Sequence, residues 1–180
     1  MPMDKVKVPE VVLTPHFKLS EFEKPYEVAG ALLPDPVPDE LIPLFREMCK
    51  QLLEPIRACF DCPIRITSGY RSPEHNDRVG GAATSQHIAT ENYCACDFTA
   101  PVDLQGIFDW IRLVSDLPFD QVILEREKDG VEPACIHISY AKEFRRMALA
   151  GLTHGRGGYI HQDVGMMAAT SLTPDLWGEA

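Results

Sequence analysis

The sequence predicts an α+β domain with a small, mainly antiparallel sheet and helices packed on one face. Two segments, 39–60 and 103–114, carry apolar residues at helical spacing. Four short segments have the composition and alternation typical of strands: 63–67, 94–99, 119–125 and 135–140. The order helix, strand, strand, helix, strand, strand is typical of helices stacked against an antiparallel sheet.

The first helix is predicted over 39–60, with Asp39 as its N-cap. Its apolar stripe recurs at spacings of three and four residues: Leu41, Phe45, Met48, Leu52 and Ile56. Pro55 lies inside this segment. Because proline has no amide hydrogen and crowds the preceding turn, we expect it to kink the helix or shorten its last turn.

The middle of the chain predicts a turn and a short helix between the first two strands. Residues 68–73 form the turn, and the helix over 73–79 has proline at its first position. The Gly- and Ala-rich segment 80–83 is expected as a flexible loop that leads to His87. After the second strand, Asp103 is the predicted N-cap of the second long helix.

The C-terminal half predicts a hairpin and then a helix. The strands at 119–125 and 135–140 are separated by a polar, glycine-containing segment, 126–133, which favours antiparallel pairing. Residues 142–150 are predicted as a final helix. From residue 151 onward no periodicity remains, and we expect a tail that lies on the surface or on a partner.

Length and composition indicate one domain with an extension at each end. The 180 residues are 45% hydrophobic and 24% charged, which is ordinary for a globular protein. We predict an extended arm over 1–37 that folds back on the domain, the domain itself over 38–150, and an irregular tail over 151–180. No apolar run approaches the roughly 20 residues of a membrane span. No apolar segment follows the N-terminus, so no secretory signal peptide is expected.

The net charge of −10 argues against one class of partner. Nucleic acids bind mainly through Lys and Arg that neutralise phosphates, so nucleic acid is not expected as a ligand. Our interpretation of the acidic balance is solubility.

Six cysteines allow an alternative metal site. Cys59 and Cys62, together with Cys94 and Cys96, are able in principle to hold a structural zinc ion through four thiolates. However, the first pair is split between a helix end and a strand start, and Cys96 alternates with residues that look buried. We therefore expect the cysteines to act as small buried hydrophobic residues.

Three polar residues stand out in or beside the predicted strands. His87 follows the glycine-rich loop, Asp97 lies in a hydrophobic strand where an unpaired carboxylate is costly to bury, and His137 alternates with two isoleucines. A lone strand histidine is more often a hydrogen-bonded structural residue. Two imidazoles and one carboxylate together, however, leave an open fourth position on zinc, which is typical of a catalytic site.

Several motifs then resemble the zinc D-alanyl-D-alanine carboxypeptidases, in particular their small phage and bacterial branch. The resemblance is carried by the segments 17–22 (FKLSEF), 63–76 (PIRITSGYRSPEHN), 79–81 (VGG), 84–87 (TSQH), 94–98 (CACDF), 117–125 (LPFDQVILE) and 136–140 (IHISY). They occur in the family's order from residue 17 to about residue 146, and the last thirty or so residues lie outside the match.

The resemblance implies a fold of that family and a role for each matching residue. Zinc (Zn²⁺) would be ligated by His87, Asp97 and His137. Arg71 would steady the developing oxyanion, and Glu125 is the candidate general base, which takes a proton from the attacking water and passes it to the leaving amine. The residues that shape the site and bind substrate are Ser85 and Gln86.

Two features depart from the family pattern. Nine residues, 88–96, separate His87 from Asp97, where the family has a shorter, glycine-containing link. We expect this loop to bulge, which puts the position of His87 in doubt. Many relatives also carry the base three residues before the last histidine, where this chain has Ala134; Glu125 and Glu132 are the substitutes, and Glu125 is preferred because it lies in the strand motif.

The resemblance therefore predicts a zinc D,D-carboxypeptidase or endopeptidase that cuts D-amino-acid bonds in peptidoglycan stem peptides. Without a visible signal peptide, a phage- or bacterium-encoded, endolysin-like enzyme is expected; if phage-encoded, it is cytoplasmic until its release at lysis or is carried in the virion. Two alternatives stay open: a virion-associated structural protein that keeps the fold with weak or no catalysis, and a zinc-dependent binder of cell-wall peptide without turnover.

In the tail, a partner contact is expected. His154 and His161 are candidate extra metal contacts, although solvated polar residues are the simpler interpretation.

Overall fold

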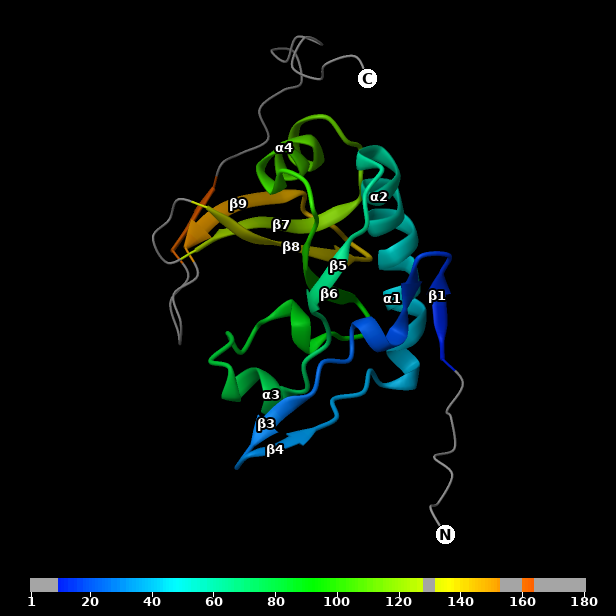
Figure 1. Ribbon diagram of the computed structural model, residues 1–180, viewed down its shortest axis with the longest axis vertical. Helices are drawn as coiled ribbons and strands as arrows, with labels where there is room; N and C mark the ends of the chain where they lie inside the picture. Colours follow the sequence, from blue (N-terminus) through cyan, green and yellow to red (C-terminus); the bar gives the residue numbers. More distant parts are fainter. Residues whose placement is uncertain (1–9, 128–131, 153–159, 164–180) are drawn as a thin grey trace.

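The computed structural model describes residues 10–127, 132–152 and 160–163 (Figure 1). Within these residues, a six-stranded sheet has the strand order β10-β9-β7-β8-β6-β5. Its strands are β5 (Arg65–Ser68), β6 (Tyr93–Thr99), β7 (Phe119–Arg126), β8 (Pro133–Ala141), β9 (Met147–Leu152) and β10 (Ile160–Asp163). All neighbours are antiparallel except β7 and β9. The predicted α+β class with a mainly antiparallel sheet is confirmed, including the hairpin of β7 with β8.

The first long helix forms where its apolar stripe predicts it. A 3₁₀ turn (Asp39–Leu41) leads into α1 (Ile42–Met48), a π-helical segment (Cys49–Leu53) and α2 (Glu54–Phe60). The expected disturbance at Pro55 takes the form of the π turn: the amide of Glu54 donates to the carbonyl of Cys49, five residues back. The helix thus widens immediately before proline, where the regular ladder would lose a donor.

The remaining helices also begin at predicted residues. In α3 (Pro73–Arg78) proline occupies the first position, and in α4 (Leu104–Leu113) the Asp103 side chain accepts from the amides of Gln105 and Gly106. In the described part of the chain, no helix has the length and apolar character needed to cross a bilayer.

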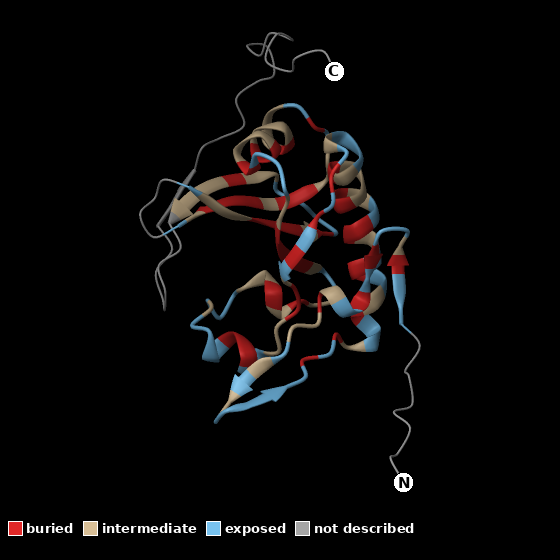
Figure 2. Ribbon diagram, in the orientation of Figure 1, coloured by how far each residue is buried: buried red, intermediate tan, exposed pale blue. Residues whose placement is uncertain are grey.

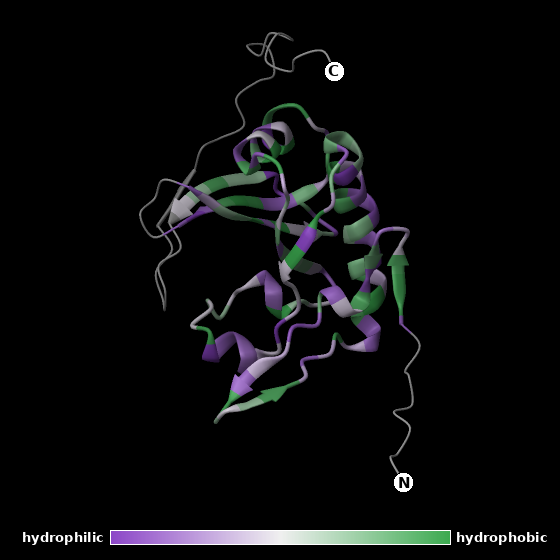
Figure 3. Ribbon diagram, in the orientation of Figure 1, coloured by the Kyte–Doolittle hydropathy of each residue, from purple (hydrophilic) through white to green (hydrophobic). Residues whose placement is uncertain are grey.

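One face of the sheet packs against α1, α2 and α4, as predicted (Figure 1). The sheet residues on this face are Cys94, Cys96, Phe98, Val122, Leu124, Ile136 and Ile138, and each is essentially inaccessible to solvent. The helices contribute Phe45, Met48, Leu52, Ile56, Ile107, Phe108 and Ile111. Figure 2 shows the buried residues along the strands and the inward sides of these helices, and Figure 3 shows that the same surfaces are hydrophobic.

The described part of the N-terminal arm folds back on the domain. It forms two short hairpins: β1 (Val12–Thr14) with β2 (Phe17–Lys18), and β3 (Tyr26–Val28) with β4 (Ala31–Leu33). Between them, a 3₁₀ turn (Leu19–Glu21) precedes Phe22, whose ring meets Phe45 edge to face at 5.4 Å. Phe17 and Phe22 are fully buried, whereas β4 is hydrophobic in Figure 3 and exposed in Figure 2.

The prediction of a final helix over 142–150 is wrong. Residues from Met147 form strand β9, which pairs in parallel with β7 and antiparallel with β10. Arg146 has a φ of 54°, a left-handed conformation that no α-helix continues through. Its guanidinium also donates to the carbonyls of Ser115 and Leu117, which brings the chain alongside β7. These long-range contacts override the helix propensity of the Ala-, Leu- and Met-rich segment.

A substitution at Gly69 would test how closely the N-terminal arm packs against the domain. A Cβ at this position would overlap the backbone of Phe22, whose carbonyl accepts from the amide of Tyr70 at 2.9 Å. We expect Gly69→Ala to lower the free energy of unfolding by about 1–3 kcal/mol, the usual cost of overpacking, in urea titrations. The matched control is Gly106→Ala in α4, where the added methyl meets only the Asp103 side chain, at 3.2 Å. Equal stability of Gly69→Ala and wild type would contradict the fit.

Candidate metal centre

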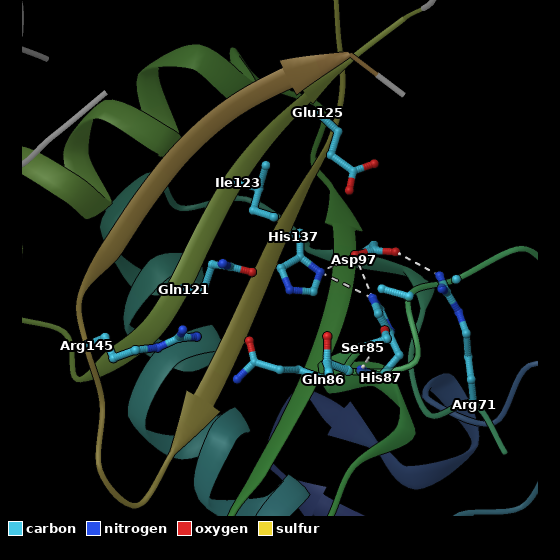
Figure 4. A pocket seen from close by; sticks show the side chains of 13 residues that line it. Arg71, Ser85, Gln86, His87, Asp97, Gln121, Ile123, Glu125, His137 and Arg145 are labelled. Carbon is cyan, nitrogen blue, oxygen red and sulfur yellow. Dashed lines mark hydrogen bonds and ion pairs between the residues drawn. The ribbon is translucent and has the colours of Figure 1, made fainter. Parts of the chain in front are cut away.

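Three buried polar side chains converge on the open face of the sheet. Asp97 of β6 and His137 of β8 are cross-strand partners, so their side chains share the face opposite the core isoleucines, as the alternation predicted. His87 reaches them from a 3₁₀ turn (Gln86–Ile88). All three are more than nine-tenths buried, and their donor atoms lie within 4.8 Å of one another. Figure 4 shows the two imidazoles and the carboxylate pointing toward one point.

The distances in this triad are compatible with three ligands of one cation. Oδ1 of Asp97 lies 2.8 Å from Nδ1 of His137 and 3.1 Å from Nε2 of His87, and the two histidine nitrogens are 3.2 Å apart. Nδ1 of His87 faces the Gly69 carbonyl at 2.6 Å, which can only accept, so this nitrogen carries the proton. Nε2 of His87, Nδ1 of His137 and Oδ1 of Asp97 thus surround one point, and tetrahedral zinc ligands lie at about this spacing from one another.

The neighbours of the triad hold each donor in place. The Gly69 carbonyl fixes the tautomer and orientation of His87. The second oxygen of Asp97 faces Nη2 of Arg71 at 3.3 Å, and the Arg71 fork also donates to the Ser68 hydroxyl at 2.7 and 3.1 Å. The carboxylate is therefore oriented with one oxygen toward the histidines and the other toward a guanidinium.

The loop of nine residues between His87 and Asp97 bulges, as expected, without moving His87 away. Ala89 adopts a φ of 49° directly after the 3₁₀ turn, and Thr90 closes a turn onto Tyr93, where β6 begins. The additional length is taken up by this turn and by β6, which begins at Tyr93, one residue before its predicted start. The structure thus brings His87 together with Asp97 and His137.

Charge at the centre shifts two carboxyl pKa values in opposite directions. Burial alone would raise the pKa of Asp97, but the adjacent His87 and His137 outweigh it and hold the pKa well below its usual range. Burial raises the pKa of Glu125 to about 7, and the negative charge of Asp97 adds to the rise. Glu125 of β7 lies on the same face of the sheet as His137. It accepts a weak hydrogen bond from the Cys135 thiol, with 3.6 Å between sulfur and oxygen. Glu132, by contrast, is exposed.

These side chains line one pocket of about 400 Å³. All seven residues predicted from the sequence contribute to it: Arg71, Ser85, Gln86, His87, Asp97, Glu125 and His137. The sequence reasoning missed Thr84, Gln121, Ile123 and Arg145. The motif around Gln121 was visible as a strand, but Arg145 fell in the wrongly predicted helix, and only the contact between Arg145 and Asp120 places it here.

The cysteine alternative is not supported in the described part of the chain, where His87, Asp97 and His137 make up the group that could hold a metal. Cys62, Cys94 and Cys96 are buried, as expected of small hydrophobic residues, whereas Cys59 is exposed. Of the two tail histidines, His154 lies outside the described residues. His161 falls in β10, where side chains are not described.

Two imidazoles and a carboxylate that open onto a pocket are a donor set typical of catalytic rather than structural metal sites. The family model described as Peptidase M15 matches residues 15–114, more than half of the sequence, and the chain belongs to this peptidase family. The match covers Arg71, His87 and Asp97 and ends before Glu125 and His137. A search of the curated proteins found no match.

Metal binding is the first property to test. We expect the purified protein to bind about one zinc ion per chain, because three donors are preassembled, and His137→Ala to weaken zinc binding by more than about 100-fold, beyond the usual effect of losing an outer-shell partner. Competition with a chelator, followed by elemental analysis, measures this. His16→Ala is the control, since His16 pairs with Glu54 on the surface. Equal zinc content in His137→Ala and wild type would contradict the site.

The raised pKa of Glu125 predicts a pH-dependent stability of the metal-free protein. The folded-state pKa of about 7 exceeds the unfolded value of about 4.3, so stability falls as pH rises between these values. Glu125→Gln removes this loss. Its stability relative to wild type should therefore increase by roughly 2 kcal/mol from pH 5 to pH 8 in urea titrations with chelator. The exposed Glu132→Gln should show no such trend, and a pH-independent difference for Glu125→Gln would refute the assignment.

Proposed function

We propose that this protein is a zinc metallopeptidase that hydrolyses D-amino-acid peptide bonds in peptidoglycan stem peptides, as a carboxypeptidase or an endopeptidase. The observation that carries the proposal is the convergence of three metal donors, a carboxyl with a pKa of about 7 and a guanidinium on one pocket. Membership of the Peptidase M15 family supports the peptidase reaction, and the motifs of the D-alanyl-D-alanine carboxypeptidases support the substrate class.

Zinc is the metal that this donor set fits best. Two imidazole nitrogens and one carboxylate oxygen match its preference for nitrogen and oxygen ligands in four-coordinate sites. When bound, zinc supplies Lewis acidity that polarises the scissile carbonyl and increases the acidity of water. His87, Asp97 and His137 would hold it, and the pocket that they line would leave room for substrate.

Glu125 is the proposed general base. It lines the pocket on the same face as His137, and its pKa of about 7 suits a group that accepts and returns a proton near neutral pH. In the proposed reaction, Glu125 takes a proton from the attacking water and delivers it to the leaving amine. Glu132, the other candidate, is exposed and is not part of the pocket lining.

Arg71 is proposed to steady negative charge that develops on the carbonyl oxygen. Its Nε and Nη2 are engaged with Ser68 and Asp97, so the guanidinium is fixed at the pocket wall before substrate arrives. A preorganised cation of this kind stabilises a developing oxyanion without reorganisation.

The two residues that precede His87 are proposed to shape the site and bind substrate. The Ser85 hydroxyl accepts from the His87 amide at 3.4 Å and so caps the turn that presents the histidine. Gln86 turns its side chain into the pocket, next to the metal donors (Figure 4).

The place of action is also a proposal. We propose a phage- or bacterium-encoded enzyme that acts at the cell wall after release at lysis or from a virion, with the C-terminal tail as a contact for a virion partner. The competing function, a virion-associated protein of the same fold with weak or no catalysis, predicts zinc binding without turnover. The intact geometry of the triad favours the enzyme.

Cleavage of purified peptidoglycan tests the proposal. The zinc-loaded protein should release D-alanine or open cross-links, detected by chromatography and mass spectrometry of the digest. Glu125→Gln should retain zinc and lower kcat by about 100-fold or more, the usual effect of losing a general base. Glu132→Gln, in the same β7–β8 hairpin directly before β8, is the matched control and should keep full activity. Full activity in Glu125→Gln would remove the base assignment, and an inactive zinc-loaded wild type would favour the non-catalytic alternative.

A further inference from the structure

We propose that the part of the pocket at Arg145 is a carboxylate-binding subsite built from Arg145 and Gln86 on a shared support, Asp120. Figure 4 shows Glu125 at the top of the pocket, Arg145 at its lower left and Arg71 at its lower right, with Gln86 between the two arginines. This inference rests on the proposed function, because it names the chemical group by which substrate is recognised at the same site.

Arg145 is held in place through a buried carboxylate. Asp120 is 2% exposed, and it accepts from Nε, Nη2 and the backbone amide of Arg145 at 2.9, 2.6 and 3.0 Å. These hydrogen bonds use one edge of the guanidinium. Nη1 has no partner among the described residues, so donors remain free at the pocket wall.

The backbone beside Arg145 shows that this position is imposed by the fold. Arg146 adopts a left-handed conformation, and its guanidinium lies 4.9 Å from the centre of the Phe119 ring while donating to the carbonyls of Ser115 and Leu117. A residue other than glycine keeps such a conformation only where its surroundings over-determine it. The two consecutive arginines are thereby held apart: Arg146 packs on Phe119, and Arg145 faces the pocket.

Gln86 contributes an acceptor that the protein leaves unsatisfied. Its Nε2 donates to Oδ2 of Asp120 at 2.7 Å. Because an ionised carboxylate only accepts, this contact fixes which end of the amide carries the oxygen. The oxygen, Oε1, is buried and has no hydrogen-bond partner among the described residues. This oxygen is shielded from solvent, so a ligand N–H meets it only after a small rotation of the Gln86 amide toward the pocket, and the missing donor favours that rotation.

Asp120 therefore aligns two complementary groups along one wall. Burial alone would raise the pKa of Asp120, but the hydrogen bonds from Arg145 and Gln86 outweigh burial and lower it, which keeps the support ionised at neutral pH. The wall offers guanidinium N–H donors and, once the Gln86 amide rotates toward the pocket, one amide oxygen beside His87. A ligand segment with an amide N–H followed by a free carboxylate satisfies both.

Stem peptides carry that chemistry at two places. One is the carboxylate of the C-terminal residue, and the other is the free α-carboxylate of a γ-linked D-glutamyl residue. Both are anions next to an amide N–H, so either one fits the subsite. Arg145 would then determine specificity by favouring peptides with that carboxylate over their amidated forms.

The test measures peptide binding to the metal-free protein, where no turnover occurs. Three probes are titrated by calorimetry: L-Ala-γ-D-Glu-L-Lys-D-Ala-D-Ala, its C-terminal amide, and the form with D-isoglutamine in place of D-glutamate. One of the two amidated peptides should bind wild type at least about tenfold more weakly than the free acid, consistent with the loss of a charge-assisted hydrogen bond. That peptide identifies which carboxylate is bound.

Variants then assign the effect to Arg145. Arg145→Ala should bind the free acid with the same weak affinity that wild type has for the discriminating amide. Amidation should not weaken binding to Arg145→Ala any further. Arg145→Lys, which keeps a positive charge beside Asp120, should bind the free acid with an affinity between those of wild type and Arg145→Ala. The matched control is Arg78→Ala, which removes a surface arginine paired with Glu74 and should bind like wild type. Equal affinity of wild type for all three peptides, or no binding of any of them, would overturn the subsite. A uniform loss in Arg145→Ala that amidation still deepens would also overturn it. Absence of cleavage by the zinc-loaded protein would count against the proposed function and leave this binding result standing.

Discussion

The buried carboxylate of Asp97 is the interaction on which the site depends. One of its oxygens faces His87 and His137, and the other faces Arg71. An ionised group at this depth persists only with such partners, because the cost of removing it from water must be offset by charge and hydrogen bonds. The pairing of β6 with β8 provides one of these partners, since it places Asp97 directly opposite His137. The helices on the far face keep the two strands in register by burying their alternate residues.

The N-terminal arm contributes to the metal centre through the backbone of Gly69. This glycine lies against Phe22 too closely for any side chain, and its carbonyl accepts a hydrogen bond from Nδ1 of His87 at 2.6 Å. The packing of Phe22 on Phe45 thus connects the arm, the first helix and the orientation of a proposed ligand. A segment that lies far from the site in sequence therefore helps to set the geometry of the donors.

The sequence was informative where local patterns decide the structure. Alternation in two strands predicted that Asp97 and His137 point away from the core, and Pro73 and Asp103 marked helix starts. It failed at residues 142–150, because helix propensity is a weak preference and the contacts that decide this segment lie elsewhere: Arg145 on Asp120 and Arg146 on Leu117. For the same reason, Arg145 was absent from the predicted site. The position of His87 was also beyond local reasoning, since the turn at Ala89 that absorbs the longer loop has no signature in the sequence.

The central claim is that His87, Asp97 and His137 form a zinc site open to the pocket, and X-ray absorption at the zinc edge tests it most directly. The account predicts a first shell of nitrogen and oxygen at about 2.0–2.1 Å, with the outer-shell pattern of two imidazoles and no sulfur at about 2.3 Å. The same spectrum should lose one imidazole in His87→Ala. A first shell that contains sulfur, or one that is unchanged by that substitution, would contradict it.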